Sequence, residues 1–493
     1  MIHPVDRFLV SASRHPGRAA ISMPDGHRTY AQLEDCVRKL AQSFCEIASP
    51  RILIALPPSV DAYAAILASM LIGGIHTPVN ISSPISKLQK IAANLEPDII
   101  VAEGSLAAAI SSAASSTRTI DPATVAGDRS FDGAGSRNPR AYIMFTSGST
   151  GTPKGVVVSA SALANYVDWL ATLGYGPDDR VSQQPNLGFD ISMTDIFGAL
   201  CHGAVLIPVA TEADRLTAAR FIKREKITIW NSTPSAVVLM MTARQLNAEN
   251  LASLRLINFC GEPLSGEILD GIFAALPSLR IQNTYGPTEA TVAVSCLALN
   301  SGNYREFVRA SAALGDPIAG MQLDLVGGAH PDEGEIAISG PQLAEGYWRD
   351  PGKTAAAFRS VDVDGKPVRA YFTGDWAERH AGRIYFRERM DFQVKLRGHR
   401  VELDEVTAAL RSCGWPVACA FKRGEALAAV VESGDEGAFD ESRLRLQLGG
   451  LLDKYAVPER ILAVTRVPRN ENDKIDRKAC AELFERLRGD ATS

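Results

Sequence analysis

The stretch AYIMFTSGSTGTPKGV, residues 141–156, joins a short apolar run to a loop of small and hydroxylated residues. The run AYIMF predicts a buried β-strand, which the loop Thr146–Gly155 follows directly. Three glycines allow a sharp turn and a close backbone approach, successive N–H groups can converge on an anion, and Lys154 adds a positive charge. It is not a Walker A motif, because Gly155 follows Lys154 and Val156 stands in the Ser/Thr place. We predict a phosphate-binding loop; the alternative is a flexible polar loop.

Strand-like apolar runs alternate with helical stretches on both sides of this loop, which favours mostly parallel sheets covered by helices. Strands are expected at 51–56, 76–80, 98–102, 141–145, 203–209, 227–230 and 254–259, and helices at 60–74 and 159–174. After Glu335 shorter strands predict an antiparallel or β-barrel-like subdomain, and the last hundred or so residues predict a small α+β unit. We therefore predict an α/β chain with a large N-terminal domain, residues 1–389, and a small mobile C-terminal domain, residues 390–493.

Composition excludes several classes of protein. The 493 residues are 46% hydrophobic and 22% charged, with a formal net charge of −5, so there is no basic excess to attract nucleic acid. No apolar run is long enough to span a membrane, and the N-terminus lacks a signal-peptide core, so we expect a cytoplasmic protein. The eight cysteines contain no C-x-x-C pair, which disfavours a zinc site or a disulfide framework.

The loop resembles the signature of the acyl-adenylate-forming superfamily, which includes nonribosomal peptide adenylation domains, acyl-CoA ligases and luciferases. Three further blocks are similar to that superfamily and follow in its order: GEIAISGPQLAEGYW (334–348), YFTGDWAERHAGRIYFRERMDFQVKLRGHRVELDEV (371–406) and PRNENDKIDRKA (468–479). The segments ITIWNSTPS (227–235), FCGEPLSG (259–266) and NTYGPTEATVAV (283–294) resemble the D-alanine–carrier protein ligases most. FDISMTDIFGAL (189–200) looks like an amino-acid-activating block.

The resemblance implies ATP and Mg²⁺ as cofactors. It assigns Tyr285 to adenine stacking, Asp375 and Arg389 to the ribose, and Glu289 to the metal. Phe386 stands where the superfamily often has a tyrosine, and Glu388 replaces a glycine, so the contacts there are expected to differ. The implied nucleotide-binding residues are Thr146, Ser147, Gly148, Ser149, Thr150, Gly151, Lys154, Tyr285, Asp375, Phe386 and Arg389.

The resemblance also implies the catalytic residues Lys474, Glu289 and Thr150. Adenylation is the attack of a carboxylate on the α-phosphorus, so the difficulty is bringing an anion to a polyanion, and a lysine with Mg²⁺ neutralises this charge. By composition alone Lys474 would be an ordinary lysine of a charged tail. Asp391 resembles the hinge residue of the superfamily; the alternative is an ordinary turn aspartate.

The resemblance carries over a set of substrate-binding residues: Asp190, Ile191, Thr194, Asn231, Asn258, Cys260, Thr284, Val292 and Ala293. Asp190 would hold the substrate ammonium, although it could also cap the helix that follows. Cys260 favours D-alanine or another small residue, whereas Thr194, Asn231 and Asn258 could suit serine, threonine or a β-amino acid. The identity and chirality of the amino acid stay open.

These residues predict activation of a small neutral amino acid to the aminoacyl-adenylate, with release of pyrophosphate. The acyl group would then pass to the phosphopantetheine thiol of a separate carrier protein, because no carrier attachment motif follows the Lys474 block. An acyl-CoA ligase for a carboxylic acid without an amine is the alternative, which the Phe189–Asp190 pair disfavours. A non-enzymatic relative would be expected to lack Lys474, Glu289 or Asp375, and all three are present.

Overall fold

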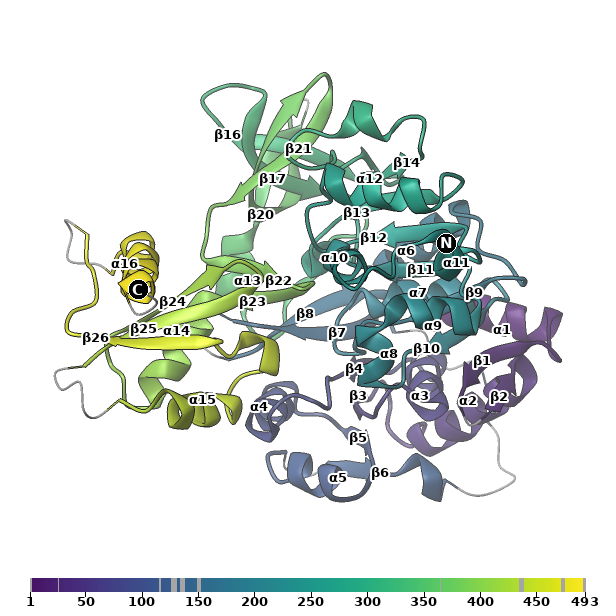
Figure 1. Cartoon of the computed structure of the whole chain (residues 1–493). Coiled ribbons are helices and arrows are strands. Elements are labelled where there is room, and N and C mark those ends of the chain that lie inside the picture. The colour runs from purple at the N-terminus through teal and green to yellow at the C-terminus, as the bar shows by residue number, and fades with distance from the viewer. Residues whose placement is uncertain are drawn as a thin grey trace. The chain divides into compact units, whose positions relative to one another are not determined.

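The computed structural model describes residues 2–24, 26–114, 117–125, 131–133, 138–148, 152–363, 365–433, 439–470 and 475–490 (Figure 1). They divide into two compact units. The first contains Met1–Asn80, Leu95–Phe145 and Gly155–Met390. The second contains Ile81–Asn94, Thr146–Lys154 and Asp391–Ser493.

The largest sheet has nine strands within the described residues and belongs to the first unit. Its order is β15(Asp316–Pro317), β14(Ser295–Leu299), β13(Arg280–Tyr285), β12(Leu256–Phe259), β11(Ile229–Ser232), β9(Arg180–Gln183), β10(Val205–Pro208), β1(Ala19–Met23) and β2(Gly26–Thr29). The six central strands from β13 to β1 run parallel, β2 and β14 are antiparallel to β1 and β13, and β15 pairs antiparallel with β14. The expectation of mostly parallel strands is confirmed for this sheet.

A seven-stranded sheet contains the strand that ends in the glycine-rich loop. Its order, again for the described chain, is β18(Gly346–Tyr347), β8(Lys154–Ser159), β7(Arg140–Thr146), β4(Ile75–Pro78), β3(Arg51–Ala55), β5(Ile99–Ala102) and β6(Arg118–Ile120). Strands β7, β4, β3, β5 and β6 run parallel, and β18 is antiparallel to β8. The loop thus leaves the carboxyl end of a parallel strand, where open α/β sheets bind ligands.

Helices and short 3₁₀ turns connect these strands. They are α1(Pro4–Arg14), α2(Tyr30–Phe44), α3(Val60–Leu71), α4(Ile85–Leu95), α5(Gly104–Ser111), α6(Ala160–Thr172), α7(Ser192–Leu200), α8(Glu212–Leu216), α9(Ala218–Glu225), α10(Pro234–Thr242), α11(Ala248–Leu251), α12(Gly266–Ala275) and α13(Pro351–Ala357), with η1(Pro122–Thr124), η2(Thr288–Ala290) and η3(Tyr304–Phe307). Side-chain caps begin several of them: Ser59 accepts from the Ala62 N–H at α3, and Ser159 accepts from the Ala162 N–H at α6. All but two residues of α3 are buried, which fits its apolar sequence.

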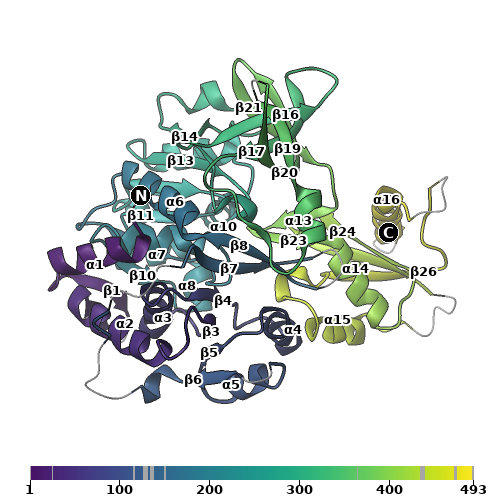
Figure 2. The same ribbon diagram turned by 180° about the vertical axis from the view of Figure 1, so that it is seen from behind.

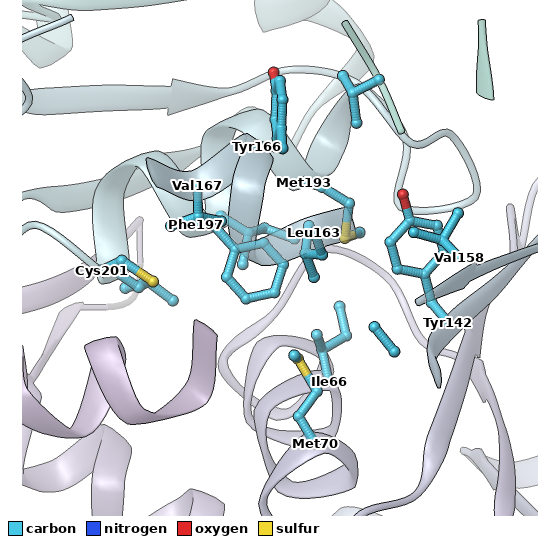
Figure 3. Packing of buried hydrophobic residues seen from close by; sticks show 14 of the residues in the cluster. Ile66, Met70, Tyr142, Val158, Leu163, Tyr166, Val167, Met193, Phe197 and Cys201 are labelled. Carbon is cyan, nitrogen blue, oxygen red and sulfur yellow. The ribbon is translucent and has the colours of Figure 1, made fainter. Parts of the chain in front are cut away.

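The main hydrophobic core joins both large sheets to helices α2, α3, α6 and α7. Figure 3 shows Ile66 and Met70 of α3 near Leu163 of α6 and Phe197 of α7. A second cluster, which includes Trp230 and helices α9, α10 and α12, covers the opposite face of the nine-stranded sheet. The nine-stranded sheet is therefore buried on both faces, as parallel sheets usually are.

An antiparallel sheet completes the first unit (Figure 2). Its strands are β16(Gln322–Gly327), β17(Glu333–Ser339), β19(Phe358–Val363), β20(Lys366–His380) and β21(Arg383–Arg389). The change to antiparallel strands expected after Glu335 is confirmed, although the sheet begins slightly earlier, at Gln322.

The second unit contains α4, part of the glycine-rich loop and a small α+β fold, as the sequence predicts. Its other elements are β22(Gln393–Leu396), β23(His399–Glu402), α14(Leu403–Ser412), β24(Ala418–Arg423), β25(Ala426–Glu432), α15(Glu441–Gly449), η5(Lys454–Ala456), β26(Arg460–Val464) and α16(Arg477–Asp490). Within this unit Lys87 of α4 donates to Asp453 at 2.6 Å, and Ser83 donates to the same carboxylate at 2.5 Å. This ion pair is buried, because only 14% and 6% of the two side chains are exposed.

Candidate active site

Three of the predicted nucleotide-binding residues form a largely buried polar cluster at the ends of β13 and β21 and within β20. The Tyr285 hydroxyl donates to Asp375 Oδ2 at 2.6 Å, and the Arg389 guanidinium donates to Asp375 Oδ1 at 2.8 Å. Asp375 and Arg389 are direct partners in the β20–β21 register, which explains their contact. A carboxylate has about four lone-pair sites, so Asp375 retains capacity to accept from two vicinal hydroxyls.

Burial, helped by the Asp375 carboxylate, raises the pKa of Tyr285 well above its usual range. The phenol therefore stays protonated at physiological pH and serves as a donor. Phe386 pairs with Ala377, which is two residues along β20 from Asp375, and its side chain packs against the main core. A bulge between Trp376 and Ala377 accompanies Glu388, the residue that departs from the expected glycine.

Glu289, the predicted metal ligand, lies in η2 and is completely buried. Its Oε1 accepts a hydrogen bond from the Tyr347 hydroxyl at 2.9 Å, which orients the carboxylate. The chain can fold tightly here because Gly286 has no side chain: a Cβ there would lie 2.6 Å from Ala293 Cα. No group of three or more His, Cys, Asp or Glu side chains that could hold a metal occurs among the described residues. One oriented carboxylate fits Mg²⁺, which takes few protein ligands and completes its shell with phosphate and water oxygens.

The glycine-rich loop is described on both sides of a short gap and belongs to the second unit. Ser147 Oγ donates to the carbonyl of Arg400 at 3.1 Å, and Thr146 ends β7. Gly148 is required sterically, because a Cβ there would lie 2.3 Å from the Thr152 carbonyl oxygen. Lys154 begins β8. The predicted loop residues Ser149, Thr150 and Gly151 lie outside the described residues.

The predicted substrate residues on β11 and β12 lie on one face of the nine-stranded sheet. Asn231 and Asn258 are neighbours in the parallel register, and side chains paired in this way point to the same face. Their face carries Ile229 and Leu256, which belong to the main core, whereas Trp230 belongs to the cluster on the opposite face. Cys260 follows Asn258 by two residues and Thr284 lies at the end of β13, so the structure brings all four together at the carboxyl end of the sheet.

Three more of the predicted substrate residues lie at the N-terminal end of helix α7: Asp190 and Ile191 just before it, and Thr194 in its first turn. The helix begins at Ser192 with Ile191 at the N-cap, and the Ile191 side chain makes no capping bond. Asp190 precedes the helix, and its carboxylate contributes to raising the pKa of the buried Tyr142 and Tyr166 phenols, after the larger effect of burial itself. Figure 3 shows both phenol oxygens directed away from Ile66 and Met70 of the apolar core.

Two of the polar residues in this set are held by other buried side chains. Thr194 shares a hydrogen bond of 2.7 Å with the Tyr166 hydroxyl. The Asn231 amide donates to Asp195 Oδ1 at 2.6 Å, and its oxygen accepts from the Tyr175 hydroxyl at 3.2 Å. By contrast Asn258, only 3% exposed, has an amide oxygen with no hydrogen-bond partner among the described residues.

The remaining substrate residues lie on an irregular segment after η2. Thr291 and Val292 adopt φ angles of 59° and 68°, a conformation that is costly for β-branched residues. Gln342 fixes the segment through two hydrogen bonds. Its side-chain amide donates to the Ala293 carbonyl at 2.7 Å, and its main-chain carbonyl accepts from the Thr291 hydroxyl at 2.7 Å. The Cys260 thiol faces the Val292 carbonyl at 3.9 Å, and the Thr284 hydroxyl donates to the Phe259 carbonyl at 2.7 Å.

The predicted catalytic Lys474 lies outside the described residues, between Asn470 and Ile475. Asp391, the predicted hinge residue, is the first residue of the last segment of the second unit. Its Oδ1 accepts from the Gln393 N–H at 3.1 Å, as an aspartate in a turn commonly does.

Sequence reasoning did not single out Asp195, Tyr166, Tyr175 or Tyr347 as residues of this region. Asp195 carried a usable signal, because it is an acidic residue inside the apolar run ISMTDIFGAL. In the structure its side chain is fully buried, and burial raises the pKa of the carboxyl well above its ordinary value despite the opposing hydrogen bond from Asn231. The three tyrosines gave no such signal, since a buried tyrosine is usual in any core of this size.

The fold and these polar clusters fit an enzyme that uses ATP to activate a carboxylic acid, and comparison with known proteins identifies the family. The family model described as AMP-binding enzyme matches residues 8–348, so the chain belongs to that family. A relative from Pseudomonas fluorescens, L-proline–[L-prolyl-carrier protein] ligase, is 30% identical over 506 residues, covering 97% of this chain and 99% of the relative. D-alanine–D-alanyl carrier protein ligase of Lactiplantibacillus plantarum is 30% identical over 498 residues, covering 95% and 96%.

Among solved structures, the Vibrio cholerae adenylation domain AlmE in complex with glycyl-adenosine-5'-phosphate superimposes with a TM-score of 0.83. It is 26% identical, with 98% of this chain and 97% of that chain covered. The names of these three proteins contain proline, D-alanine and glycine respectively, so similarity alone does not select a substrate. No helix of the described residues is both long and apolar enough to cross a membrane.

Proposed function

We propose that this protein uses ATP to activate a small neutral amino acid as its aminoacyl-adenylate and then transfers the acyl group to the phosphopantetheine thiol of a carrier protein. In the first step a carboxylate oxygen of the amino acid bonds to the α-phosphorus while the bond to the β-phosphate bridging oxygen breaks, releasing pyrophosphate. In the second step the thiol sulfur attacks the carbonyl carbon, AMP leaves, and the thiol proton is lost to solvent. The carrier-protein ligases of similar length and sequence support this proposal.

The residue that carries the amino-acid part is Asp190, a half-buried carboxylate whose charge contributes to raising the pKa of the buried Tyr142 and Tyr166 phenols. An α-ammonium group placed at such a carboxylate would form an ion pair with it. A substrate without an amine would bring its own carboxylate toward Asp190 without that compensating charge. This is the physical reason for preferring an amino acid to the alternative, a fatty or aromatic acid for acyl-CoA formation.

The chain's own residues would divide the work with ATP. Asp375, held by Tyr285 and Arg389, would accept from the ribose hydroxyls, and the glycine-rich loop would offer N–H groups and hydroxyls to the departing phosphates. Glu289, oriented by Tyr347, would hold Mg²⁺, which neutralises phosphate charge when bound. Lys474 would place its ammonium between the substrate carboxylate and the α-phosphate.

Amino-acid-dependent exchange of labelled pyrophosphate into ATP tests the first step, using a panel of amino acids and of fatty acids with no amine. Mass measurement of a phosphopantetheinylated carrier protein after incubation tests the second step. We expect exchange with amino acids only, and an acyl group on the carrier. Exchange with fatty acids but with no amino acid would refute the proposal.

Asp190→Asn provides the matched test of the ammonium contact. A hydrogen bond to a charged group is worth about 1.5–3 kcal/mol, so kcat/KM should fall by roughly 10- to 150-fold. Asp178→Asn is the control, because the Asp178 side chain is 97% exposed in the same unit. Equal activity of the two variants would argue against Asp190 as the ammonium contact.

A further inference from the structure

Asn258 is a buried polar residue of the predicted substrate region whose amide oxygen the protein does not pair among the described residues. The residue lies on β12 and is 3% exposed, and its amide oxygen has no hydrogen-bond partner among the described residues. Leaving a buried acceptor unpaired costs about 1–3 kcal/mol, and buried polar atoms without partners are rare in folded proteins. Such an atom is expected to meet a donor when the protein is at work.

Its polar neighbours differ in this respect. Asn231, the register partner of Asn258, donates to Asp195 and accepts from Tyr175, so its amide orientation is fixed inside the protein. The hydroxyl of Thr194 is paired with Tyr166. Two of the three residues that gave the region its polar character therefore have protein partners.

The position of Asn258 relates the amide to the substrate. It lies on the same sheet face as Asn231, and the Asp195–Asn231 hydrogen bond ties helix α7 to that face. The same helix follows Asp190, the residue proposed to hold the ammonium group. In the proposed function, an amino acid held at Asp190 would direct its side chain toward the Asp195–Asn231 contact, and Asn258 is the register partner of Asn231.

We propose that Asn258 accepts a hydrogen bond from the side chain of the substrate, so that the enzyme selects a small amino acid whose side chain carries a donor, such as a hydroxyl group. This inference rests on the proposed function and narrows it to one class of substrate. Alanine, glycine and proline side chains cannot supply the donor, and with them the Asn258 oxygen stays buried and unpaired. A site of this kind rejects analogues that lack the donor more strongly than an apolar site rejects an extra hydroxyl.

Pyrophosphate exchange with matched amino-acid pairs tests the inference in the unaltered protein. The pairs are L-serine with L-alanine, D-serine with D-alanine, and L-threonine with L-2-aminobutyrate, each differing by a single hydroxyl. Because the unpaired acceptor costs about 1–3 kcal/mol, the hydroxylated member should have a kcat/KM at least fivefold and up to about 150-fold higher. A preference for the apolar member in every pair that reacts would overturn the inference, and no exchange with any amino acid would overturn the proposed function along with it.

Asn258→Leu removes the acceptor while keeping a side chain of similar size. We expect the hydroxyl preference to fall to about one. Asn283→Leu is the matched control, because Asn283 is a buried asparagine of the adjacent strand whose amide donates to the Ala313 carbonyl at 2.9 Å. An unchanged hydroxyl preference in Asn258→Leu, or an equal loss of preference in Asn283→Leu, would overturn the inference. If Asn258→Leu fails to fold, the matched amino-acid pairs in the unaltered protein still decide whether the enzyme prefers a hydroxylated substrate.

Discussion

Replacing Asp195 with asparagine should stabilise the protein at neutral pH, even though the residue is fully buried and hydrogen-bonded. Burial raises the pKa of Asp195 well above its ordinary value, which favours the neutral carboxyl in the folded protein, and asparagine has nearly the same shape and no charge. In the unfolded chain the carboxyl ionises above a pKa of about 3.9. Between the unfolded and the folded pKa, folding of the unaltered protein must therefore take up a proton, and folding of the variant need not.

The size of the effect follows from linkage. A group with a raised folded pKa contributes stability that is complete below its unfolded pKa and is lost as pH rises toward the folded pKa. Over that interval the unaltered protein loses about 1.36 kcal/mol per pH unit relative to Asp195→Asn. The two proteins should have similar stability near pH 4, and the lead of the variant should grow as pH rises from the unfolded pKa toward the folded pKa. The asparagine oxygen can still accept from Asn231, so that contact persists.

Urea unfolding at a series of pH values between 4 and 7, followed by circular dichroism, measures this difference. Asp179→Asn is the contrasting control. Asp179 accepts from Arg255 at 2.6 Å, and although burial opposes it, the bonds from Arg255 and Thr228 lower the pKa of Asp179. That variant should be less stable than the unaltered protein at neutral pH and approach it as pH falls. A stability difference for Asp195→Asn that stays constant or shrinks with rising pH would refute the assignment of a protonated Asp195.

Three further predictions concern the nucleotide site and the second unit. Lys474→Ala should lose most pyrophosphate exchange while ATP binding, measured by calorimetry, stays nearly intact; normal exchange would exclude the catalytic role. Tyr285→Phe removes the donor to Asp375 but keeps the ring, so the KM for ATP should rise by about tenfold or more, from the 1.5–3 kcal/mol of such a bond, and unchanged ATP kinetics would show that the hydroxyl is dispensable. Asp453→Asn breaks its buried pair with Lys87 and should cost about 3–5 kcal/mol at neutral pH in denaturant unfolding. Although burial opposes it, Lys87 lowers the pKa of Asp453, so this loss should fade as pH drops through that pKa.

The secondary structure was predictable where local sequence determines it. The strands AYIMF and RILIAL and the helix over residues 60–74 follow from short apolar runs and a continuous apolar stretch, and each appears with bounds shifted by a few residues. Gly148 was predictable for the same reason, because a close backbone approach is a local property of the loop.

Side-chain partners were much less predictable, because they join residues that are distant in the sequence. Tyr285 and Asp375 are 90 positions apart, and Asn231 and Asp195 are 36 apart. A polar residue in an apolar strand has the same sequence signature whether the protein satisfies it, as with Asn231, or leaves it unpaired, as with Asn258. Only the packed neighbours distinguish the two, so the sequence alone could not show which of these polar groups already has a protein partner.

The Thr291–Val292 segment has a consequence for redesigning substrate choice. Part of the substrate region consists of side chains on the regular strands β11 and β12, whose backbone is held by neighbouring strands on both sides. The other part is an irregular segment whose left-handed residues are held in place by Gln342. Mutations at Asn258 should alter chemistry on a backbone that stays fixed, whereas mutations at Val292 should release local strain and move the chain. Mutant libraries made to accept new amino acids would therefore contain two kinds of substitution. Those on β11 and β12 would change the groups that recognise the substrate, and those in the Thr291–Val292 segment would change the course of the backbone.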